Sequence, residues 1–309
     1  MITIAVTDTF PPFLYDAMRD AGWNPVDGTS WSAEELPDRL NESKARAILV
    51  RSRTKVTRDL MNAVPGLRIV ARGGVGLDNV DQEAAREKGI AVLNTPGASA
   101  GAVAELVILF LLAIARKLPV ADAGIKAGRW EKKYLRGVEI AGRTLGIAGF
   151  GNIGRVVANR ALGMGMKVIW FDPAPIDPGE LGAVTREVSW DELLKESDFI
   201  TLHIPLLDAT RHLMNEDAFA KMKPGAGLVH CARGGVVDEQ ALAEALRSGR
   251  LSGAGLDVFE TEPPGDSPLW DCPGVVATPH VGASTEEAQR RVSLEIADRI
   301  VHTWKEIGD

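Results

Sequence analysis

Cysteine is scarce in this chain: only 2 of its 309 residues are cysteines, Cys231 and Cys272. A disulfide framework needs several paired cysteines and a cysteine zinc site needs closely spaced ones, so we expect neither, and no bound metal. The first residues, MITIAVTD, lack the charged and apolar regions of a signal peptide and predict a strand instead. This composition favours a reducing compartment, and we expect a cytoplasmic location.

Positive charge and long apolar runs are also in short supply. The 35 Lys and Arg are outnumbered by 42 Asp and Glu, which gives a net charge of −7, and no basic block stands out. Nucleic-acid binding normally needs such a block, so we expect no DNA or RNA partner. The most apolar run, Leu106 to Ala115, is shorter than the roughly 18 residues that a membrane span needs. We expect no membrane segment and interpret this run as a buried helix at a domain or subunit interface.

Short β-branched runs alternate with helical patterns from the beginning of the chain. Strands are predicted within residues 2–6, 45–52, 67–74 and 90–94, and helices around residues 11–21, 32–43, 57–64 and 80–88. This alternation is typical of βαβ units, in which helices cover both faces of a parallel sheet. The sequence therefore predicts an α/β fold.

A second series of strands begins near residue 143, after NTPGAS and the long apolar helix have interrupted the first. Residues 284–307 predict one final helix, with Ser284 or Thr285 as its cap and two glutamates in its first turn. Because this helix follows the last strand of the second series, we expect it to return to the first domain. The expected organisation is a discontinuous first domain, 1–98 plus 286–309, and a second domain, 99–285, with a cleft between them.

The motif GFGNIG places Gly149, Gly151 and Gly154 between a predicted strand and a predicted helix. In that context the glycines allow a tight turn, the close approach of a pyrophosphate to the helix N-terminus, and the packing of helix on strand. A second strand ends at Asp172, about 20 residues further on, where a carboxylate binds the adenosine ribose. Since that carboxylate would repel a 2′-phosphate, we predict NAD rather than NADP as the cofactor.

Three of the five histidines, His203, His230 and His280, follow predicted strands of the second series, at the edge of a parallel sheet where ligands usually bind. His280 is the strongest candidate for proton transfer because it lies in the glycine-containing turn PHVGAS. Arg233, in CARGGVVDE, is suited to bind a carboxylate through two parallel hydrogen bonds. Glu262, in FETEPP, is suited to orient a histidine. Each residue alone also fits an ordinary surface role; their occurrence at successive strand ends favours catalysis.

Together these motifs resemble the D-isomer-specific 2-hydroxyacid dehydrogenases over nearly the whole chain. VRSRTKVT, ARGGVGLDNVD, NTPGAS, GRWEKK and PHVGASTEEAQ are most similar to the phosphoglycerate dehydrogenase branch. The resemblance implies two doubly wound parallel-sheet domains, a flavodoxin-like substrate-binding domain and a Rossmann NAD-binding domain. It also implies hydride transfer between NAD and C2 of a hydroxy acid: His280 takes the hydroxyl proton, Glu262 polarises His280, and Arg233 binds the substrate carboxylate.

The resemblance implies binding residues as well. Besides the three motif glycines, the expected cofactor contacts are Asn152, Ile153, Asp172, Pro205, Cys231, Ala232, Asp257 and Gly282. The expected substrate contacts in the first domain are Arg51, Arg72, Gly73 and Gly74. Positive charge for a phosphate is expected from Arg51 and Arg53, with Lys132 or Lys133 of a neighbouring subunit. The helix near Ala102–Arg116 is expected to form a homodimer interface.

The leading hypothesis is the oxidation of 3-phosphoglycerate to 3-phosphohydroxypyruvate, the entry to serine synthesis. The alternatives are a hydroxypyruvate or glyoxylate reductase and, in another class, a non-catalytic NAD-sensing protein such as a corepressor. A formate dehydrogenase is disfavoured, because such an enzyme is expected to have a glutamine as the partner of the catalytic histidine, where this chain has Glu262. Departures from the family pattern at Val75, Ser99, Leu207 and His230 leave the catalytic set intact. We expect no regulatory amino-acid-binding domain after the last helix, and hence no serine feedback through one.

Overall fold

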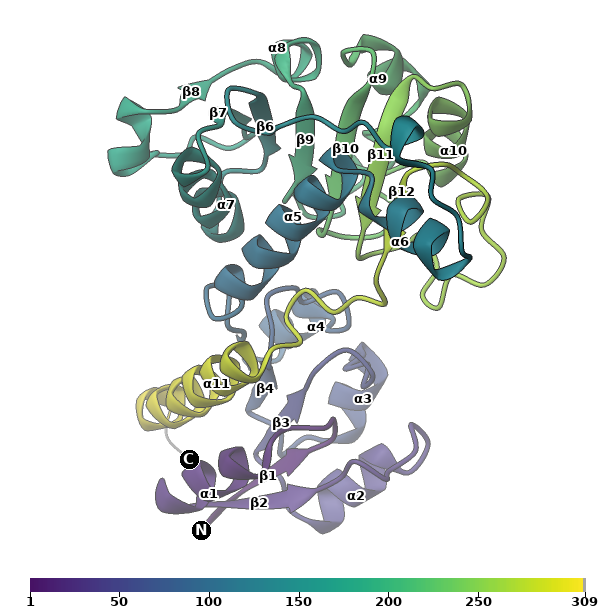
Figure 1. The fold of residues 1–309 in the computed structure, drawn as a ribbon. Coiled ribbons are helices and arrows are strands. Elements are labelled where there is room, and N and C mark those ends of the chain that lie inside the picture. Colours follow the sequence, from purple (N-terminus) through teal and green to yellow (C-terminus); the bar gives the residue numbers. More distant parts are fainter. Residues whose placement is uncertain (308–309) are drawn as a thin grey trace. The chain divides into compact units, whose positions relative to one another are not determined.

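The computed structural model describes residues 1–307 of the chain, which divides into two compact units. Unit 1 contains Met1–Ser99 and the C-terminal residues from Ser284 onward, and unit 2 contains Ala100–Ala283. Each unit is a parallel β-sheet with helices on both faces (Figure 1). The prediction of two α/β parallel-sheet domains is therefore confirmed.

The sheet of unit 1 has five parallel strands in the order β2-β1-β3-β4-β5. This is the flavodoxin-like order, in which the direction of strand addition reverses between β1 and β3. The strands are β1 (Ile2–Val6), β2 (Trp23–Asp27), β3 (Ala47–Val50), β4 (Ile69–Arg72) and β5 (Ala91–Leu93).

The helices of unit 1 bury an apolar core on each face of this sheet. One core is covered by the first helix and the last helix of the chain, and the other by the three helices between them. Thr285 begins the last helix because its hydroxyl accepts a hydrogen bond from the Ala288 amide at 3.1 Å. The helices are α1 (Pro12–Asp20), α2 (Leu36–Glu42), α3 (Arg58–Ala63), α4 (Gln82–Glu87) and α11 (Glu286–Ile307).

The sheet of unit 2 has seven parallel strands in the order β12-β11-β10-β9-β6-β7-β8. This is the doubly wound Rossmann order with one added strand, and its reversal lies between β6 and β9. Such a reversal opens a crevice at the carboxyl ends of the strands, where ligands bind. The strands are β6 (Thr144–Ala148), β7 (Lys167–Phe171), β8 (Arg186–Glu187), β9 (Phe199–Leu202), β10 (Ala226–His230), β11 (Leu251–Leu256) and β12 (Val275–Ala277).

The apolar helix of unit 2, α5 (Ala100–Ala115), packs with α7 (Asn152–Gly163) on one face of this sheet (Figure 1). Most side chains of α5 are buried in that core. Among the described residues, Leu109 is the one large hydrophobic residue of α5 that is exposed. The opposite face is covered by α8 (Trp190–Glu196), α9 (Glu216–Lys221) and α10 (Glu239–Arg247). The remaining helical elements are α6 (Leu118–Lys126), η1 (Lys132–Tyr134) and η2 (Gly179–Ala183).

Two strands, β2 and β8, were not predicted from the sequence pattern. β2 contains Pro25 and alternates little between apolar and polar residues, yet it pairs with β1 along five positions. Proline is tolerated there because β2 is an edge strand, and only one side of it needs to pair. β8 is two residues long and also lies at an edge. Tertiary pairing decides both strands, since neither has a strong pattern of its own.

Candidate active site

The glycine loop of unit 2 connects β6 to α7 and is built as a phosphate-binding turn. Gly149 has a φ of 96°, and a Cβ there would lie 2.6 Å from the carbonyl oxygen of His203. A Cβ at Gly154 would lie 2.1 Å from the carbonyl oxygen of Gly149, so helix and strand approach too closely for any side chain. By contrast, a Cβ at Gly151 would meet nothing within 4 Å. The first and third glycines are thus required by the fold, while the second faces open space.

The N-terminus of α7 follows this open position directly. Gly151 is its N-cap and provides no side chain to satisfy the first amides of the helix. The positive end of the dipole of a 12-residue helix favours an anion such as a pyrophosphate. Asn152 and Ile153, two of the expected cofactor contacts, are the first residues of this helix. The loop therefore fits the pyrophosphate of a dinucleotide.

Asp172 follows β7 and holds the glycine loop in place. One carboxylate oxygen accepts a hydrogen bond from the Phe150 amide at 2.8 Å, and the other accepts one from the Ala174 amide at 3.0 Å. The residue remains partly exposed beside the loop. A carboxylate so placed fits the role of ribose acceptor and adds a role that the motif did not predict, the bracing of the phosphate turn.

His280 and Glu262 are brought together by the fold. The Nδ1 atom of His280 lies 2.8 Å from Oε2 of Glu262, although the residues are 18 positions apart. The other carboxylate oxygen of Glu262 accepts a hydrogen bond from the Phe259 amide at 3.2 Å. Both side chains are accessible, 48% for His280 and 38% for Glu262. Because Nδ1 is engaged by the carboxylate, Nε2 is the nitrogen left to exchange a proton with a substrate.

Asp257 organises the turn that carries His280. One of its buried carboxylate oxygens accepts hydrogen bonds from the Thr278 hydroxyl at 2.6 Å and from the Val281 amide at 2.7 Å. The other accepts a bond from the Gly282 amide at 2.8 Å. His280 itself has a φ of 52°, a left-handed conformation that is uncommon outside glycine. These three bonds hold the catalytic candidate in that conformation.

Arg233 lies in the turn after β10, and that turn touches the loop of Glu262. Its Nη1 donates a hydrogen bond to the carbonyl oxygen of Ala232 at 2.7 Å. A Cβ on the next residue, Gly234, would lie 1.7 Å from the carbonyl oxygen of Phe259. The two loops are therefore in backbone contact immediately after Arg233 and shortly before Glu262.

The other two strand-end histidines are in a different situation. Burial lowers the pKa of His203 to about 3 and that of His230 to about 4, because an apolar environment disfavours the charged imidazolium. Both ring nitrogens of His230 are buried without a hydrogen-bond partner among the described residues, as is Nδ1 of His203. Both residues are neutral near pH 7. They are poor proton carriers, which leaves His280 as the candidate.

The remaining expected cofactor residues lie at the same edge of the sheet. Pro205 follows β9, and its carbonyl oxygen accepts a bond from the Thr210 hydroxyl at 2.7 Å. Cys231 and Ala232 follow β10 and are buried. Burial raises the pKa of the Cys231 thiol well above its usual value, which disfavours a role as a nucleophile.

In unit 1, the expected substrate residues surround the carboxyl ends of β3 and β4. The Arg51 guanidinium lies over the ring of Phe10, with 5.4 Å from Cζ to the ring centroid. Desolvation lowers the pKa of Arg51, and Asp8 opposes that shift. Within residues 1–307 the side chain of Arg51 has no hydrogen bond or ion pair. It is thus a half-buried cation suited to bind an anion.

The neighbouring residues shape this cation site. A Cβ at Gly73 would lie 2.6 Å from the Phe10 ring, and Gly74, with a φ of 155°, would press a Cβ to 2.8 Å from Nη1 of Arg72. Both glycines are therefore needed for the packing of Phe10 and Arg72. The Nε of Arg72 donates to the carbonyl oxygen of Arg51 at 3.2 Å, which ties the two arginine loops together.

Asp8 is a residue of this region that the sequence did not indicate. Its buried carboxylate accepts bonds from the Arg51 amide at 2.5 Å, from the Thr54 hydroxyl at 2.8 Å and from Nε of Arg53 at 3.2 Å. Arg53 is thereby paired within the unit, which leaves Arg51 as the guanidinium available to an anion. The only signal in the sequence is an aspartate at a strand end, which is common in α/β folds.

Within residues 1–307, no helix is long and apolar enough to cross a membrane, and His, Cys, Asp and Glu form no group of three placed to hold a metal ion.

Comparison with known proteins agrees with this geometry. Residues 108–282, more than half of the chain, match the family described as D-isomer specific 2-hydroxyacid dehydrogenase, NAD binding domain. The chain belongs to this family. It is an oxidoreductase of the NAD-dependent D-2-hydroxyacid dehydrogenases, and the predictions of family and cofactor are confirmed.

Three relatives illustrate the range of the family. The chain is 53% identical over 264 residues to a hydroxypyruvate reductase of Thermotoga maritima, covering 84% of each chain. It is 45% identical over 301 residues to a D-3-phosphoglycerate dehydrogenase of Methanocaldococcus jannaschii, covering 97% of this chain but 57% of that protein. The crystal structure of a D-lactate dehydrogenase from Aquifex aeolicus complexed with NAD and lactic acid is similar with a TM-score of 0.84 and 30% identity, covering 98% of this chain and 96% of that one.

Proposed function

We propose that this protein oxidises 3-phosphoglycerate to 3-phosphohydroxypyruvate with NAD, and catalyses the reverse reduction. The observation that carries the proposal is Arg51, a half-buried guanidinium in unit 1 that the carboxylates of residues 1–307 leave without an ion pair. A substrate with two anionic ends needs a second cationic group in addition to the one that binds its carboxylate. We assign Arg233 to the carboxylate and Arg51 to the phosphate, with Arg72, Gly73 and Gly74 shaping the site of Arg51.

In this assignment His280 is the general base of the oxidation. Its Nε2 removes the proton of the C2 hydroxyl, while Glu262 at Nδ1 fixes the ring and stabilises the imidazolium that forms. Arg233 aligns the substrate by a planar fork on its carboxylate. NAD, when bound, supplies the acceptor for the hydride of C2. In the reduction, His280 returns the proton to the carbonyl oxygen.

The second candidate is a hydroxypyruvate reductase, which the relative from Thermotoga maritima favours. The same acid-base machinery serves both reactions, since only the group at C3 differs. A panel of 2-oxo acids assayed with NADH separates the two. A kcat/KM for 3-phosphohydroxypyruvate above those for hydroxypyruvate and glyoxylate supports our first proposal. The opposite order replaces it with the second, and binding of NADH without turnover of any 2-oxo acid removes both.

We propose further that the chain forms a homodimer through α5 and the segment that follows it. Leu109 on α5 is exposed, and the next exposed large hydrophobic residues are concentrated in one stretch of sequence: Leu118, Val120, Ile125, Trp130, Tyr134 and Val138. Exposed apolar side chains in such number are typical of an association surface. Sedimentation equilibrium of the wild type and of Trp130→Asp tests this: a dimer that the substitution weakens supports the assignment, and a monomeric wild type contradicts it.

We also propose a cytoplasmic location and a role in serine synthesis, which follows from the proposed substrate. The two cysteines support a reducing compartment because both are buried and unpaired. Restoration of growth without serine in a host that lacks phosphoglycerate dehydrogenase would support the biosynthetic role, and no restoration by an expressed and active protein would contradict it.

A further inference from the structure

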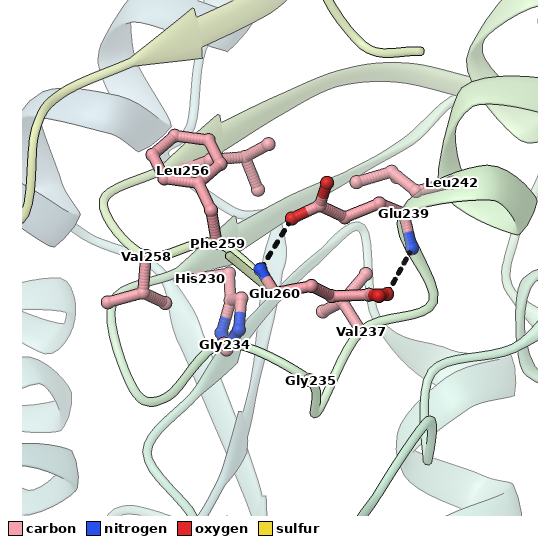
Figure 2. A pocket seen from close by; sticks show the side chains of 10 residues that line it. All are labelled: His230, Gly234, Gly235, Val237, Glu239, Leu242, Leu256, Val258, Phe259 and Glu260. Atoms are coloured by element: carbon pink, nitrogen blue, oxygen red, sulfur yellow. Dashed lines mark hydrogen bonds between the residues drawn. The ribbon is translucent and has the colours of Figure 1, made fainter. Parts of the chain in front are cut away.

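The two loops that carry Arg233 and Glu262 are joined by a second set of acidic residues, which the proposed chemistry does not use. Glu239 is the first residue of α10, and Glu260 lies two residues before Glu262. The Glu239 amide donates to Oε1 of Glu260 at 3.1 Å, and the Glu260 amide donates to Oε1 of Glu239 at 2.8 Å. Figure 2 shows these reciprocal bonds as dashed lines at the edge of a pocket that Gly234 and Phe259 also line.

The Glu260 carboxylate occupies a position that α10 itself favours. The amide of Glu239 is among the first of the helix, which have no partner within it, and the positive end of the helix dipole attracts a negative charge. Asp238, the N-cap, accepts the Ala241 amide at 3.0 Å and so satisfies a different donor. Glu260 therefore acts as an additional cap supplied by the catalytic loop, and the helix in turn anchors that loop.

Glu239 completes the attachment at the far end of the same loop. Its Oε2 accepts a bond from the Ser267 hydroxyl at 3.4 Å, while its Oε1 binds the Glu260 amide. Glu262 lies between these two attachment points in sequence. Burial raises the pKa of Glu239, and repulsion by Glu260 adds to that rise. The cost of placing two carboxylates close together is offset by the backbone amides that each of them binds.

His212 lies against this acidic group. Its Nε2 lies 3.2 Å from Oε1 of Glu260, and its Nδ1 lies 4.0 Å from Oδ2 of Asp238. It has a left-handed φ of 48°, and its amide donates to the carbonyl oxygen of Gly235 at 2.8 Å. A third loop is thereby attached to the turn of Arg233 and to Glu260.

We propose that Glu260 and Glu239 are positioning residues for the dehydrogenase reaction: their reciprocal bonds hold the Glu262 loop against the N-terminus of α10, the helix that follows the Arg233 turn, so that Glu262 stays within hydrogen-bond distance of His280. The inference rests on the proposed function for its kinetic consequence, but the attachment itself exists without substrate. The path is short, since Glu260 adjoins Phe259, whose amide binds Glu262. The titratable groups that face the attachment are His212 and Asp238, and the one that faces His280 is Glu262.

The test compares Glu260→Ala, Glu260→Gln and a control, Asp266→Ala, which removes an exposed carboxylate from the same loop. Hydrogen exchange of the Phe259 and Glu239 amides, measured without substrate, should quicken at least tenfold in Glu260→Ala. It should remain within about twofold of the wild type in the control and in Glu260→Gln, which keeps the acceptor oxygen. Unchanged exchange in Glu260→Ala overturns the inference, whatever the activity of the protein.

The kinetic readout uses the reduction of the best 2-oxo acid found in the panel. We expect kcat of Glu260→Ala to fall roughly tenfold with KM for NADH unchanged, because a small misplacement of a catalytic group is costly. The alkaline limb of its pH profile should move to lower pH by about half a unit, since a loosened carboxylate stabilises the imidazolium less. In Glu260→Gln, both kcat and the position of the alkaline limb should lie close to those of the wild type.

A second background separates positioning from general damage to the fold. In a Glu262→Gln protein, the added Glu260→Ala should lower kcat by no more than about twofold, since the residue through which Glu260 acts is already impaired. If Glu260→Ala lowers kcat by the same factor in the wild type and in the Glu262→Gln protein, the positioning role is contradicted. If no 2-oxo acid is reduced by the wild type, the proposed function fails, and amide exchange still decides whether the attachment holds the Glu262 loop.

Discussion

The carboxyl edges of the two sheets follow the same design but place their charges differently. In each unit a buried aspartate at a strand end accepts amides from a neighbouring loop, Asp8 in unit 1 and Asp257 in unit 2. In unit 2 the loop so held presents an acid-base pair, His280 with Glu262. In unit 1 it presents Arg51, a cation without an ion pair in its unit. The difference teaches that one edge is suited to proton transfer and the other to the binding of an anion.

The largest effect is expected from the acid-base pair. His280→Ala should lower kcat by roughly a hundredfold to ten-thousandfold, the usual contribution of a general acid or base. Steady-state oxidation of NADH with a 2-oxo acid measures it. His302→Ala removes an exposed histidine of α11 and should leave kcat unchanged. If His280→Ala turns over like the wild type, the proton is carried by another group.

The carboxylate fork comes next. Arg233→Lys should lower kcat/KM by about a hundredfold, mainly by raising KM, because an ammonium does not reproduce two parallel hydrogen bonds. The loss should be similar for phosphorylated and unphosphorylated 2-oxo acids, since both carry the carboxylate. Arg86→Lys, at an exposed position of α4, is the matched control. An unaltered KM would remove Arg233 from the binding of the carboxylate.

Arg51 tests the other side of the comparison. Arg51→Gln should raise KM for 3-phosphohydroxypyruvate by roughly tenfold to thirtyfold, the worth of one hydrogen bond to a charged group. KM for hydroxypyruvate should stay within about twofold. The control, Arg46→Gln, changes an exposed arginine whose Nη1 bonds the Gly66 carbonyl. An equal rise in KM for both substrates would show that Arg51 does not bind the phosphate.

Cofactor choice is expected to respond less. Asp172→Ala should narrow the preference for NAD over NADP by about tenfold, because it removes the ribose acceptor and the charge that repels a 2′-phosphate. Ratios of kcat/KM for NADH and NADPH measure this, with Asp177→Ala as a control in the same segment. Unchanged discrimination would assign to Asp172 only the bracing of the Phe150 amide.

The smallest change concerns stability and pH in unit 1. Burial alone would raise the pKa of Asp8, but hydrogen bonds from Thr54, Arg51 and Arg53 outweigh it and lower that pKa below 3.8. A depressed folded-state pKa contributes stability that is present above the unfolded value and is lost as pH falls through the folded one. Asp8→Asn should therefore cost about 1 to 3 kcal/mol at pH 7 and less near pH 3. Urea unfolding at both pH values measures the gap, and a gap that widens in acid contradicts the assignment.

Local patterns in the sequence were sufficient for the fold class and the family, though not for the edge strands β2 and β8. The alternation of β-branched and helical segments predicts parallel sheets, since the period of each element is a property of neighbouring residues. Gly149 and Gly154 belong to a motif whose meaning is steric, and the structure shows the close approaches that exclude a side chain. The last helix was predicted with its cap, because capping depends on residues within one turn.

Other features depended on residues far apart in the chain. Three histidines lie at predicted strand ends, and the sequence favoured His280 from its glycine-containing turn alone. The structure adds that burial keeps His203 and His230 neutral, while the fold brings His280 to a carboxylate 18 positions away. The sequence offered two arginines of one loop, Arg51 and Arg53, for a phosphate. The structure shows that Arg53 pairs with Asp8, which is 45 positions away in the chain, so Arg51 is the arginine that remains available to an anion. Motif and period reside in the local sequence, whereas burial and pairing, which set the charge and reactivity of each side chain, exist only once distant segments pack together.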